Sequence, residues 1–240
     1  MSGAVRIGCS GFHYAHWRGV FYPPDLPEHE WFGWYARYFD SVEINNTFYR
    51  LPERSVFAQW RDQTPPGFCY TVKFSRFATH RKKLKDPAEP VARFLDRTQP
   101  LAGLLGAVLV QLPPNWRVNT ERLEGFLAAL PASYRWAIEF RDRSWLCDGV
   151  YALLEKYGAA LCVHDMLERH PRRLTADWTY LRFHGTHYSG SYSRQFLAPL
   201  ARRLRDYAAA GVDAYVYFNN DAQGRAVCNA LTLKRYLSRL

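Results

Sequence analysis

The chain has 240 residues, of which 48% are hydrophobic and 22% are charged, a composition that suits one large α/β domain or two small ones. No apolar run reaches the roughly 18 residues of a membrane span, and the first residues, MSGAVRIGCSG, lack the basic and apolar regions of a secretory signal, so we expect no membrane partner. The formal net charge of +10 favours anionic partners, either nucleic acid or phosphorylated or carboxylated small molecules.

The cysteines argue against a metal ribbon and against a disulfide framework. There are five of them, an odd number, and no two form a C-x-x-C pair. Several lie in apolar runs, such as Cys69 in GFCYTV and Cys162 in AALCVHD, and are interpreted as small core residues. This usage predicts a reducing, cytoplasmic location.

Eight short segments have the composition of buried strands. Most are near-continuous runs of β-branched and aromatic residues, which is typical of strands covered on both faces. In chain order they are residues 4–9, 41–45, 68–74, 106–112, 135–140, 159–165, 178–185 and 213–220.

Helical patterns fall between these strands. The predicted helices are residues 30–39, 53–63, 87–98, 119–131, 144–158, 193–211 and 224–240. The fourth opens on a capping Asn119 or Thr120, and the fifth ends at Gly158, a natural helix stop. Residues 166–177 show only a short RRL run, so one helix is expected to be degenerate there.

The alternation predicts a closed (β/α)8 TIM-like barrel, one domain over residues 1–240. An open doubly wound sheet is the competing architecture, but GCSGF at 8–12 matches a dinucleotide-binding glycine pattern poorly. The one long irregular piece, residues 10–29, holds too many aromatic residues to be disordered.

Polar side chains cluster where the predicted strands end. In a barrel of this type the site lies at the carboxyl ends of the strands, and alternate residues share a face. Read in this way, the strand ends carry Glu43, Asn45, Lys73, Ser75, Gln111, Glu139, Arg141, Asp165, Arg182, His184, Tyr217 and Asn219, with His164 pointing the other way.

This set is explained either by a wet pocket or by a structural ion-pair network. An unpaired buried charge costs several kcal/mol, against a total stability of about 5–15 kcal/mol for a domain. Six charges cannot therefore be filler, and a ligand or catalytic pocket is the favoured interpretation. Gln111 and Tyr217 are explained equally well as packing residues with one hydrogen bond.

Two further features lie near the predicted strand ends. The glycine- and serine-rich residues 185–194 and the residues 219–225 that lead into a helix resemble a phosphate cradle, although a flexible surface loop explains them as well. Aromatic residues near the strand ends would form either a stacking surface for a base or sugar or, as we favour, a hydrophobic lid. They are Trp17, Phe21, Tyr22, Phe48, Tyr49, Trp116 and Trp145.

Seven motifs in order, from IGCSGFHYAHWRGVFYP through YFDSVEINNTFYRLP, VKFSRFATH, VLVQLPPNW, AIEFRDRSW and YLRFHG to YVYFNND, resemble the DUF72 or YecE-like family. The resemblance spans almost the whole chain. It implies a TIM-like barrel and no particular reaction. The residues that match the family's strand ends are Glu43, Asn45, Thr47, Tyr49, Lys73, Glu139, Arg141, Trp145, Arg182, His184, Asn219 and Asn220.

The leading hypothesis is an enzyme that acts on a small or terminal anionic substrate. Arg141 and Arg182 suit bidentate binding of a carboxylate or phosphate, and Glu43 and Glu139 suit acid and base roles. Lys73 would be an electrophile or a Schiff-base amine. Asp165 and His184 complete the predicted catalytic set, and Asn45, Tyr49, Trp145, Asn219 and Asn220 complete the substrate-binding set.

Two alternatives remain open. In a metal-assisted hydrolase or isomerase, Glu43, Glu139, Asp165 and His184 would hold a divalent metal, which the nearby Lys73 and Arg141 disfavour. We therefore predict no cofactor. A nucleic-acid-binding or processing protein would explain the net charge, but the basic clusters at 81–85, 172–173 and 201–207 are scattered. The sequence makes no prediction of oligomeric state.

Overall fold

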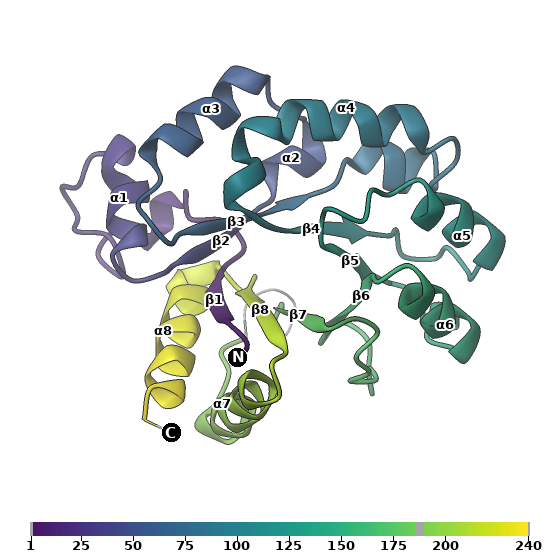
Figure 1. Cartoon of the computed structure of the whole chain (residues 1–240). Helices are drawn as coiled ribbons and strands as arrows, with labels where there is room; N and C mark the ends of the chain where they lie inside the picture. Colours follow the sequence, from purple (N-terminus) through teal and green to yellow (C-terminus); the bar gives the residue numbers. More distant parts are fainter. Residues whose placement is uncertain (1, 186–189, 240) are drawn as a thin grey trace. The chain divides into compact units, whose positions relative to one another are not determined.

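The eight strands form a parallel sheet. The computed structural model describes residues 2–185 and 190–239. Hydrogen-bonded neighbours follow the order β1-β8-β7-β6-β5-β4-β3-β2, and the strands alternate with helices (Figure 1). The strands are β1 (Val5–Cys9), β2 (Ser41–Ile44), β3 (Cys69–Lys73), β4 (Leu105–Gln111), β5 (Trp136–Glu139), β6 (Ala160–His164), β7 (Trp178–Phe183) and β8 (Asp213–Phe218). This is the (β/α)8 TIM-like barrel predicted from the alternation.

Each predicted helix has a counterpart in the structure. The helices are α1 (Trp31–Ala36), α2 (Asn46–Tyr49), α3 (Arg54–Gln63), α4 (Ala88–Thr98), α5 (Thr120–Ala128), α6 (Asp148–Lys156), α7 (Arg194–Ala209) and α8 (Arg225–Leu237). The short α2 and a π-helical turn at Phe77–Arg81 were not predicted. None of the helices within residues 2–185 and 190–239 is both long and apolar enough to cross a membrane.

Local chemistry explains the helix ends. Asn119 caps α5, because its side chain accepts a hydrogen bond from the Arg122 amide at 2.8 Å. Gly158 follows α6 with φ +65°, a left-handed conformation that a side chain disfavours. Both signals were visible in the sequence, and both predictions are confirmed.

The connection between β6 and β7 contains no helix, as predicted. It is held to β6 by one buried hydroxyl: Thr175 Oγ1 accepts from the Leu161 amide at 2.8 Å and donates to the Ala159 carbonyl at 2.7 Å. A side chain therefore provides the hydrogen bonds that fasten the end of this long connection to β6.

The chain divides into two compact units. The first unit comprises Met1–Glu43, Pro65–Phe68 and Leu181–Leu240, and the second comprises Ile44–Thr64 and Cys69–Tyr180. A single domain over residues 1–240 stays a prediction.

In the first unit, β1 pairs with β8 in parallel register from Val5 with Ala214 to Cys9 with Phe218. The aromatic segment 10–29 packs beside this pair. Trp17 and Tyr22 are buried, and Tyr22 stacks on Trp31 with ring centroids 4.8 Å apart. The Trp17 indole donates to the Asp221 carbonyl at 3.1 Å. The segment is thus ordered by ring packing, as its composition indicates.

In the second unit, β3, β4, β5 and β6 pair in sequence, all parallel. In this register Gln111 on β4 lies opposite Glu139 on β5. The two side chains therefore reach the carboxyl edge of the sheet together, which is the edge where barrel sites form.

Candidate functional site

The strand-end residues of the first unit centre on a buried ion pair. Glu43 and Arg182 are both fully buried. The Arg182 Nε donates to both Glu43 carboxylate oxygens at 3.1 and 2.9 Å, and Nη2 donates to Oε1 at 2.7 Å. The guanidinium and carboxylate planes thus meet in the fork geometry that makes arginine–carboxylate pairs strong.

Two neighbours complete this pair. Ser10 donates to Glu43 Oε1 and accepts from Arg182 Nη2 at 3.2 Å. Arg182 Nη1 lies 3.1 Å from His184 Nε2. Because arginine can only donate, Nε2 must be the unprotonated nitrogen of a neutral His184. Ser10 could not be predicted from the sequence, since a serine after a strand carries no signal of its own.

The pair therefore has the properties of a structural ion-pair network. Charges held this far from water are tolerated only when hydrogen bonds satisfy them. Arg182 uses its donors on Glu43, Ser10 and His184, and no part of it reaches solvent. That Arg182 binds the substrate, and that Glu43 and His184 are catalytic, stay predictions.

The asparagines after β8 differ in position. Asn219 is partly exposed, and its backbone amide donates to the Phe183 carbonyl at 2.7 Å. Asn220 is fully buried and donates to the Gly190 carbonyl at 2.7 Å and to Asn229 Oδ1 at 2.9 Å. Asn220 thus ties residue 190 to α8. Residues 186–189 of the predicted phosphate cradle lie outside the described residues.

In the second unit, a carboxylate and a guanidinium meet at the end of β5. The Arg141 Nε donates to Glu139 Oε1, and Nη2 lies 3.4 Å from Gln111 Oε1. The Cys162 Sγ lies 3.9 Å from Glu139 Oε2. Glu139 is fully buried, whereas about 10% of the Arg141 side chain is exposed. The carboxylate therefore lies beneath an arginine that reaches solvent.

The end of β6 carries a buried neutral histidine. His164 Nε2 donates to the Phe140 carbonyl at 2.7 Å, and Nδ1 accepts from the Met166 amide at 3.2 Å. Burial lowers the pKa of His164 to about 4, with Glu139 opposing the change. His164 thus holds the β5 and β6 ends together. The next residue, Asp165, predicted to be catalytic, is exposed.

Lys73, at the end of β3, lies against an aromatic ring. Its Nζ is 4.2 Å from the centroid of Phe48, in cation–π geometry. The Thr47 hydroxyl donates to the Lys73 carbonyl at 2.7 Å, so the short α2 is fastened to β3. Phe48 also meets the ring of His80, with centroids 5.1 Å apart. Lys73 and His80 are therefore neighbours across one ring.

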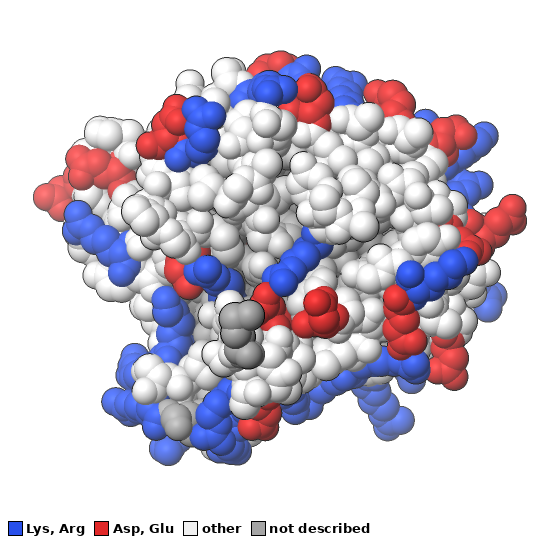
Figure 2. Space-filling view, viewed as in Figure 1, with Lys and Arg blue, Asp and Glu red and all other residues white. Residues whose placement is uncertain are grey.

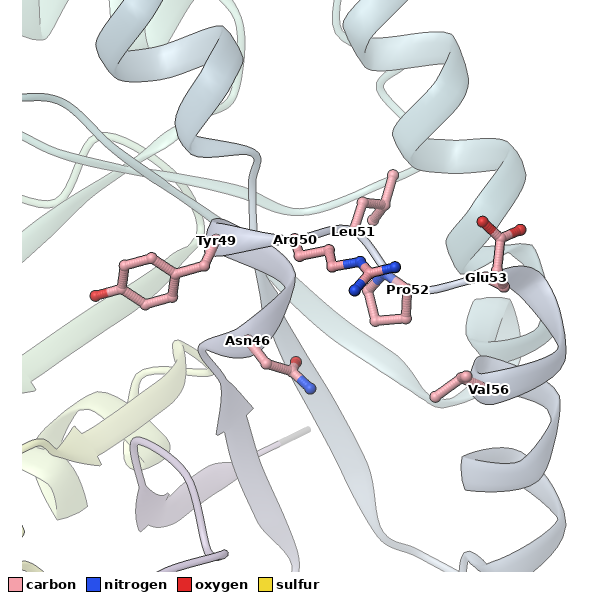
Figure 3. A pocket seen from close by; sticks show the side chains of 7 residues that line it. All are labelled: Asn46, Tyr49, Arg50, Leu51, Pro52, Glu53 and Val56. Atoms are coloured by element: carbon pink, nitrogen blue, oxygen red, sulfur yellow. The ribbon is translucent and has the colours of Figure 1, made fainter.

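Tyr49 is the most exposed of the aromatic residues predicted to lie near the strand ends. Its relative exposure is 72%, whereas Trp17, Tyr22, Phe48 and Trp145 are buried. Tyr49 borders a groove of about 530 Å³ whose wall includes Asn46, Arg50, Leu51, Pro52, Glu53 and Val56 (Figure 3). The side chain of Tyr49 points away from those of Pro52 and Val56 in this view. Its ring is available for stacking.

Trp145 and Asn45, both predicted to bind substrate, occupy other positions. Trp145 stacks on Phe140 with an interplanar angle of 13° and donates to the Trp116 carbonyl at 2.5 Å. It is a buried support beneath the β4 and β5 loops. Asn45 is the residue that precedes α2 and is partly exposed.

Histidine 80 and Arg76 were missed by the sequence analysis. Both follow β3 in the segment SRFATHR, where the π-helical turn places them near Lys73. The alternation of side chains between the two faces of a sheet ends with the strand, so it makes no prediction for residues in the turn that follows. A basic run directly after a strand end was the available signal.

No group of three or more His, Cys, Asp or Glu side chains arranged to hold a metal ion occurs within residues 2–185 and 190–239. The polar strand-end residues of the two units thus form two sets. One holds Glu43, Arg182, His184 and Ser10, and the other holds Lys73, His80, Glu139 and Arg141. That all of them face one cavity stays a prediction.

A (β/α)8 barrel with charged side chains at the carboxyl ends of its strands defines the class of this protein. Residues 6–240 match the model of the family described as "Protein of unknown function DUF72", and the chain belongs to that family. The resemblance of the seven motifs is thereby confirmed.

Solved structures and curated relatives agree with this assignment. The crystal structure of a DUF72 family protein from Thermotoga maritima is 31% identical, with a TM-score of 0.88 over 98% of this chain and 99% of that one. The UPF0759 protein YecE of Escherichia coli K12 is 34% identical over 48% of this chain, and the match spans 43% of that protein's length. The UPF0759 protein YunF of Bacillus subtilis is 23% identical over 87% of this chain and 86% of its own.

Proposed function

We propose that the protein is an enzyme that acts on a small anionic substrate, with a buried carboxylate as the proton-transfer group. One observation carries this proposal. In the second unit, cationic side chains gather at the strand ends around His80 and beside the buried Glu139.

Burial and nearby charges both act on His80. Burial, then Arg76, Lys73 and Arg141, lower the pKa of this histidine to about 4, and Glu139 opposes the change. Three cations near one site give a positive potential that attracts an anion. Arg76 is exposed, and it has no ion-pair partner within residues 2–185 and 190–239. It is therefore the cation that an incoming ligand meets.

Glu139 is the carboxylate best suited to proton transfer in this unit. Its burial disfavours the charged form, while the Arg141 guanidinium favours it. Opposed effects of this kind are how enzymes hold a carboxyl group near its working protonation state. Arg141 keeps the carboxylate in place, and the Tyr49 groove would receive the uncharged part of the substrate.

Anion binding tests the proposal. Two exposed arginines of the second unit are compared, Arg76 as the test and Arg93 as the control. Arg76 directly precedes the π-helical turn that carries His80, and its charge acts on that histidine, whereas Arg93 is exposed on α4. We expect Arg76→Gln to weaken binding of phosphorylated or carboxylated compounds at least about tenfold, the loss of one charge-assisted hydrogen bond. Arg93→Gln should change affinity less than about twofold. Isothermal titration with a panel of such anions measures both.

The carboxylate is tested separately. Once a substrate is found in this panel, Glu139→Gln should keep its affinity and lower kcat by about 10²- to 10⁴-fold. Equal losses for Arg76→Gln and Arg93→Gln, or no binding of any anion by the unaltered protein, would contradict the proposed function.

A further inference from the structure

His80 is held in a single tautomer by its neighbour. The Thr79 hydroxyl donates its one proton to the Ser75 carbonyl at 3.0 Å. The same oxygen lies 2.9 Å from His80 Nδ1. With the hydroxyl proton donated to Ser75, Nδ1 carries the imidazole hydrogen and donates it to Thr79, and we assign this tautomer to His80. The lone pair of the imidazole is therefore on Nε2.

The Nε2 atom is an available acceptor. No hydrogen bond to it is made by residues 2–185 or 190–239, and the ring is partly exposed. Phe48 holds the ring edge-on, with an interplanar angle of 80°. Thr79 is fully buried, so its hydroxyl holds the imidazole from the protein interior.

The surroundings combine positive charge with a proton acceptor. Burial, then Arg76, Lys73 and Arg141, lower the pKa of His80 to about 4, so the imidazole is neutral at pH 7, and Glu139 opposes the change. The cations attract an anion, but the unprotonated Nε2 needs a hydrogen-bond donor. A fully deprotonated anion offers only lone pairs, which Nε2 repels. An anion that keeps an O–H group meets both demands.

Phosphate is such an anion. Inorganic phosphate keeps one O–H group at neutral pH in its hydrogen-phosphate form, whereas a phosphate monoester, whose second pKa is about 6, has largely lost its last proton there. Carboxylates lose their proton near pH 4, and sulfate carries none at neutral pH. The protonation state therefore separates phosphate from anions of similar size and charge.

We propose that Arg76 and His80 bind inorganic phosphate, as a substrate or product of the enzyme, in its hydrogen-phosphate form, with the phosphate O–H group donating to His80 Nε2. Arg76 donates hydrogen bonds to the other oxygens, and Lys73 and Arg141 supply the potential. If the proton moves to Nε2, the phosphate gains one negative charge and the imidazole one positive charge, so the total is unchanged. This proposal rests on the proposed function and narrows its substrate class.

Inorganic phosphate and sulfate at pH 7.5 are the decisive probes, since both are mainly dianions and only phosphate has an O–H group. By isothermal titration we expect phosphate to bind at least about tenfold more tightly than sulfate. His80→Gln should reduce this ratio to less than about threefold, because an amide can also donate to sulfate. His29→Gln, at a histidine whose side chain is 81% exposed, should leave it unchanged.

The unaltered protein offers a second measurement. Lowering the pH from 7.5 towards 5 should strengthen sulfate binding and shrink the phosphate-to-sulfate ratio, because His80 can then take its proton from water.

Several results would overturn the proposal. Sulfate binding as tightly as phosphate, with Arg76→Gln weakening both, would refute the phosphate assignment and leave an anionic substrate in place. A ratio that His80→Gln does not change would refute the role of His80. Absence of any anion binding would overturn this proposal and the proposed function together.

Discussion

At the scale of single residues, burial decides what a charged side chain does. Arg182 and Arg141 were both predicted, from the ends of their strands, to bind an anionic substrate. Arg182 is fully buried against Glu43, whereas Arg141 reaches solvent beside Glu139. The first therefore supports its unit, and the second lies where a ligand can approach.

The Glu43–Arg182 pair makes a stability prediction. Arg182→Ala should lower the free energy of unfolding by about 3–5 kcal/mol, because it leaves Glu43 charged, buried and unpaired. Urea unfolding followed by circular dichroism measures the change. Arg202→Ala, at an exposed arginine on α7, is the control and should cost less than about 0.5 kcal/mol.

A double variant separates lost charge from lost packing. Glu43→Gln combined with Arg182→Met removes both charges, and it should recover at least half of the stability lost in Arg182→Ala. Full stability of the single variant would show that Glu43 does not depend on this arginine.

The site residues could be predicted only in part, for a physical reason. Glu43, Lys73, Glu139 and Arg141 are visible because a charge inside an apolar strand pattern is costly and must be explained. Ser10, Arg76 and His80 lie beyond the strand ends, where polar residues are ordinary. Their positions depend on a bridge from Ser10 to Glu43 and on a π-helical turn, and neither has a reliable sequence signal.

At the scale of elements, β6 and the loop after it depend on a neutral histidine. His164 connects the Phe140 carbonyl to the Met166 amide, and the ring of His170 packs against it with centroids 4.6 Å apart. Burial also lowers the pKa of His170, whose Nδ1 donates to the Pro171 carbonyl at 2.9 Å. Protonation of His164 would break the bond from Met166, since Nδ1 would no longer accept.

This arrangement predicts acid sensitivity. In the unfolded chain His164 takes up its proton near pH 6.5, and in the folded protein only near pH 4, so the unfolded state binds more protons between these values. Stability should therefore fall as the pH is lowered from about 6.5 to 4, by about 2–3 kcal/mol from this residue.

Urea unfolding at pH 7, 6, 5 and 4 measures the effect. His164→Gln should show a shallower decline over this window, although it is less stable at pH 7. The exposed His29→Gln is the matched control and should follow the unaltered protein. An identical slope for His164→Gln would show that other groups cause the acid sensitivity.

The elements themselves were largely predictable. All eight strands and seven helices follow from apolar runs and helical spacing, because each strand is buried on both faces and each long helix on one. The four-residue α2 was missed, since so short a segment shows no periodicity. It carries Phe48, which contacts Lys73, and Tyr49, which borders the groove.

At the scale of the whole molecule, the net charge of +10 affects every encounter with an anion. Figure 2 shows Lys and Arg side chains over α7 and α8, at the lower left. The exposed arginines on these helices are Arg194, Arg202, Arg205 and Arg235, and the exposed Arg239 follows α8. They lie in the first unit, outside the site proposed in the second.

The charge predicts retention on an anionic resin. We expect the protein to bind immobilised heparin and to elute as salt rises, because exposed charges are screened by ions. Reversing Arg202 and Arg205 to Glu should lower the eluting salt concentration more than reversing Arg81 and Lys85, which changes the net charge equally. Equal shifts would mean that net charge alone, and not the α7–α8 surface, determines retention.

The sequence by itself determined the eight strands, the seven longer helices and the barrel, because residue type and spacing indicate burial and backbone conformation locally, and its motifs showed the family resemblance. It also marked the strand ends as polar. Only the tertiary structure decided that Arg182 is held by Glu43, Ser10 and His184 while Arg76 reaches solvent, and that Thr79 turns His80 to present Nε2. These outcomes depend on contacts between side chains and on backbone turns that no periodicity encodes, so they appear only once the chain is folded.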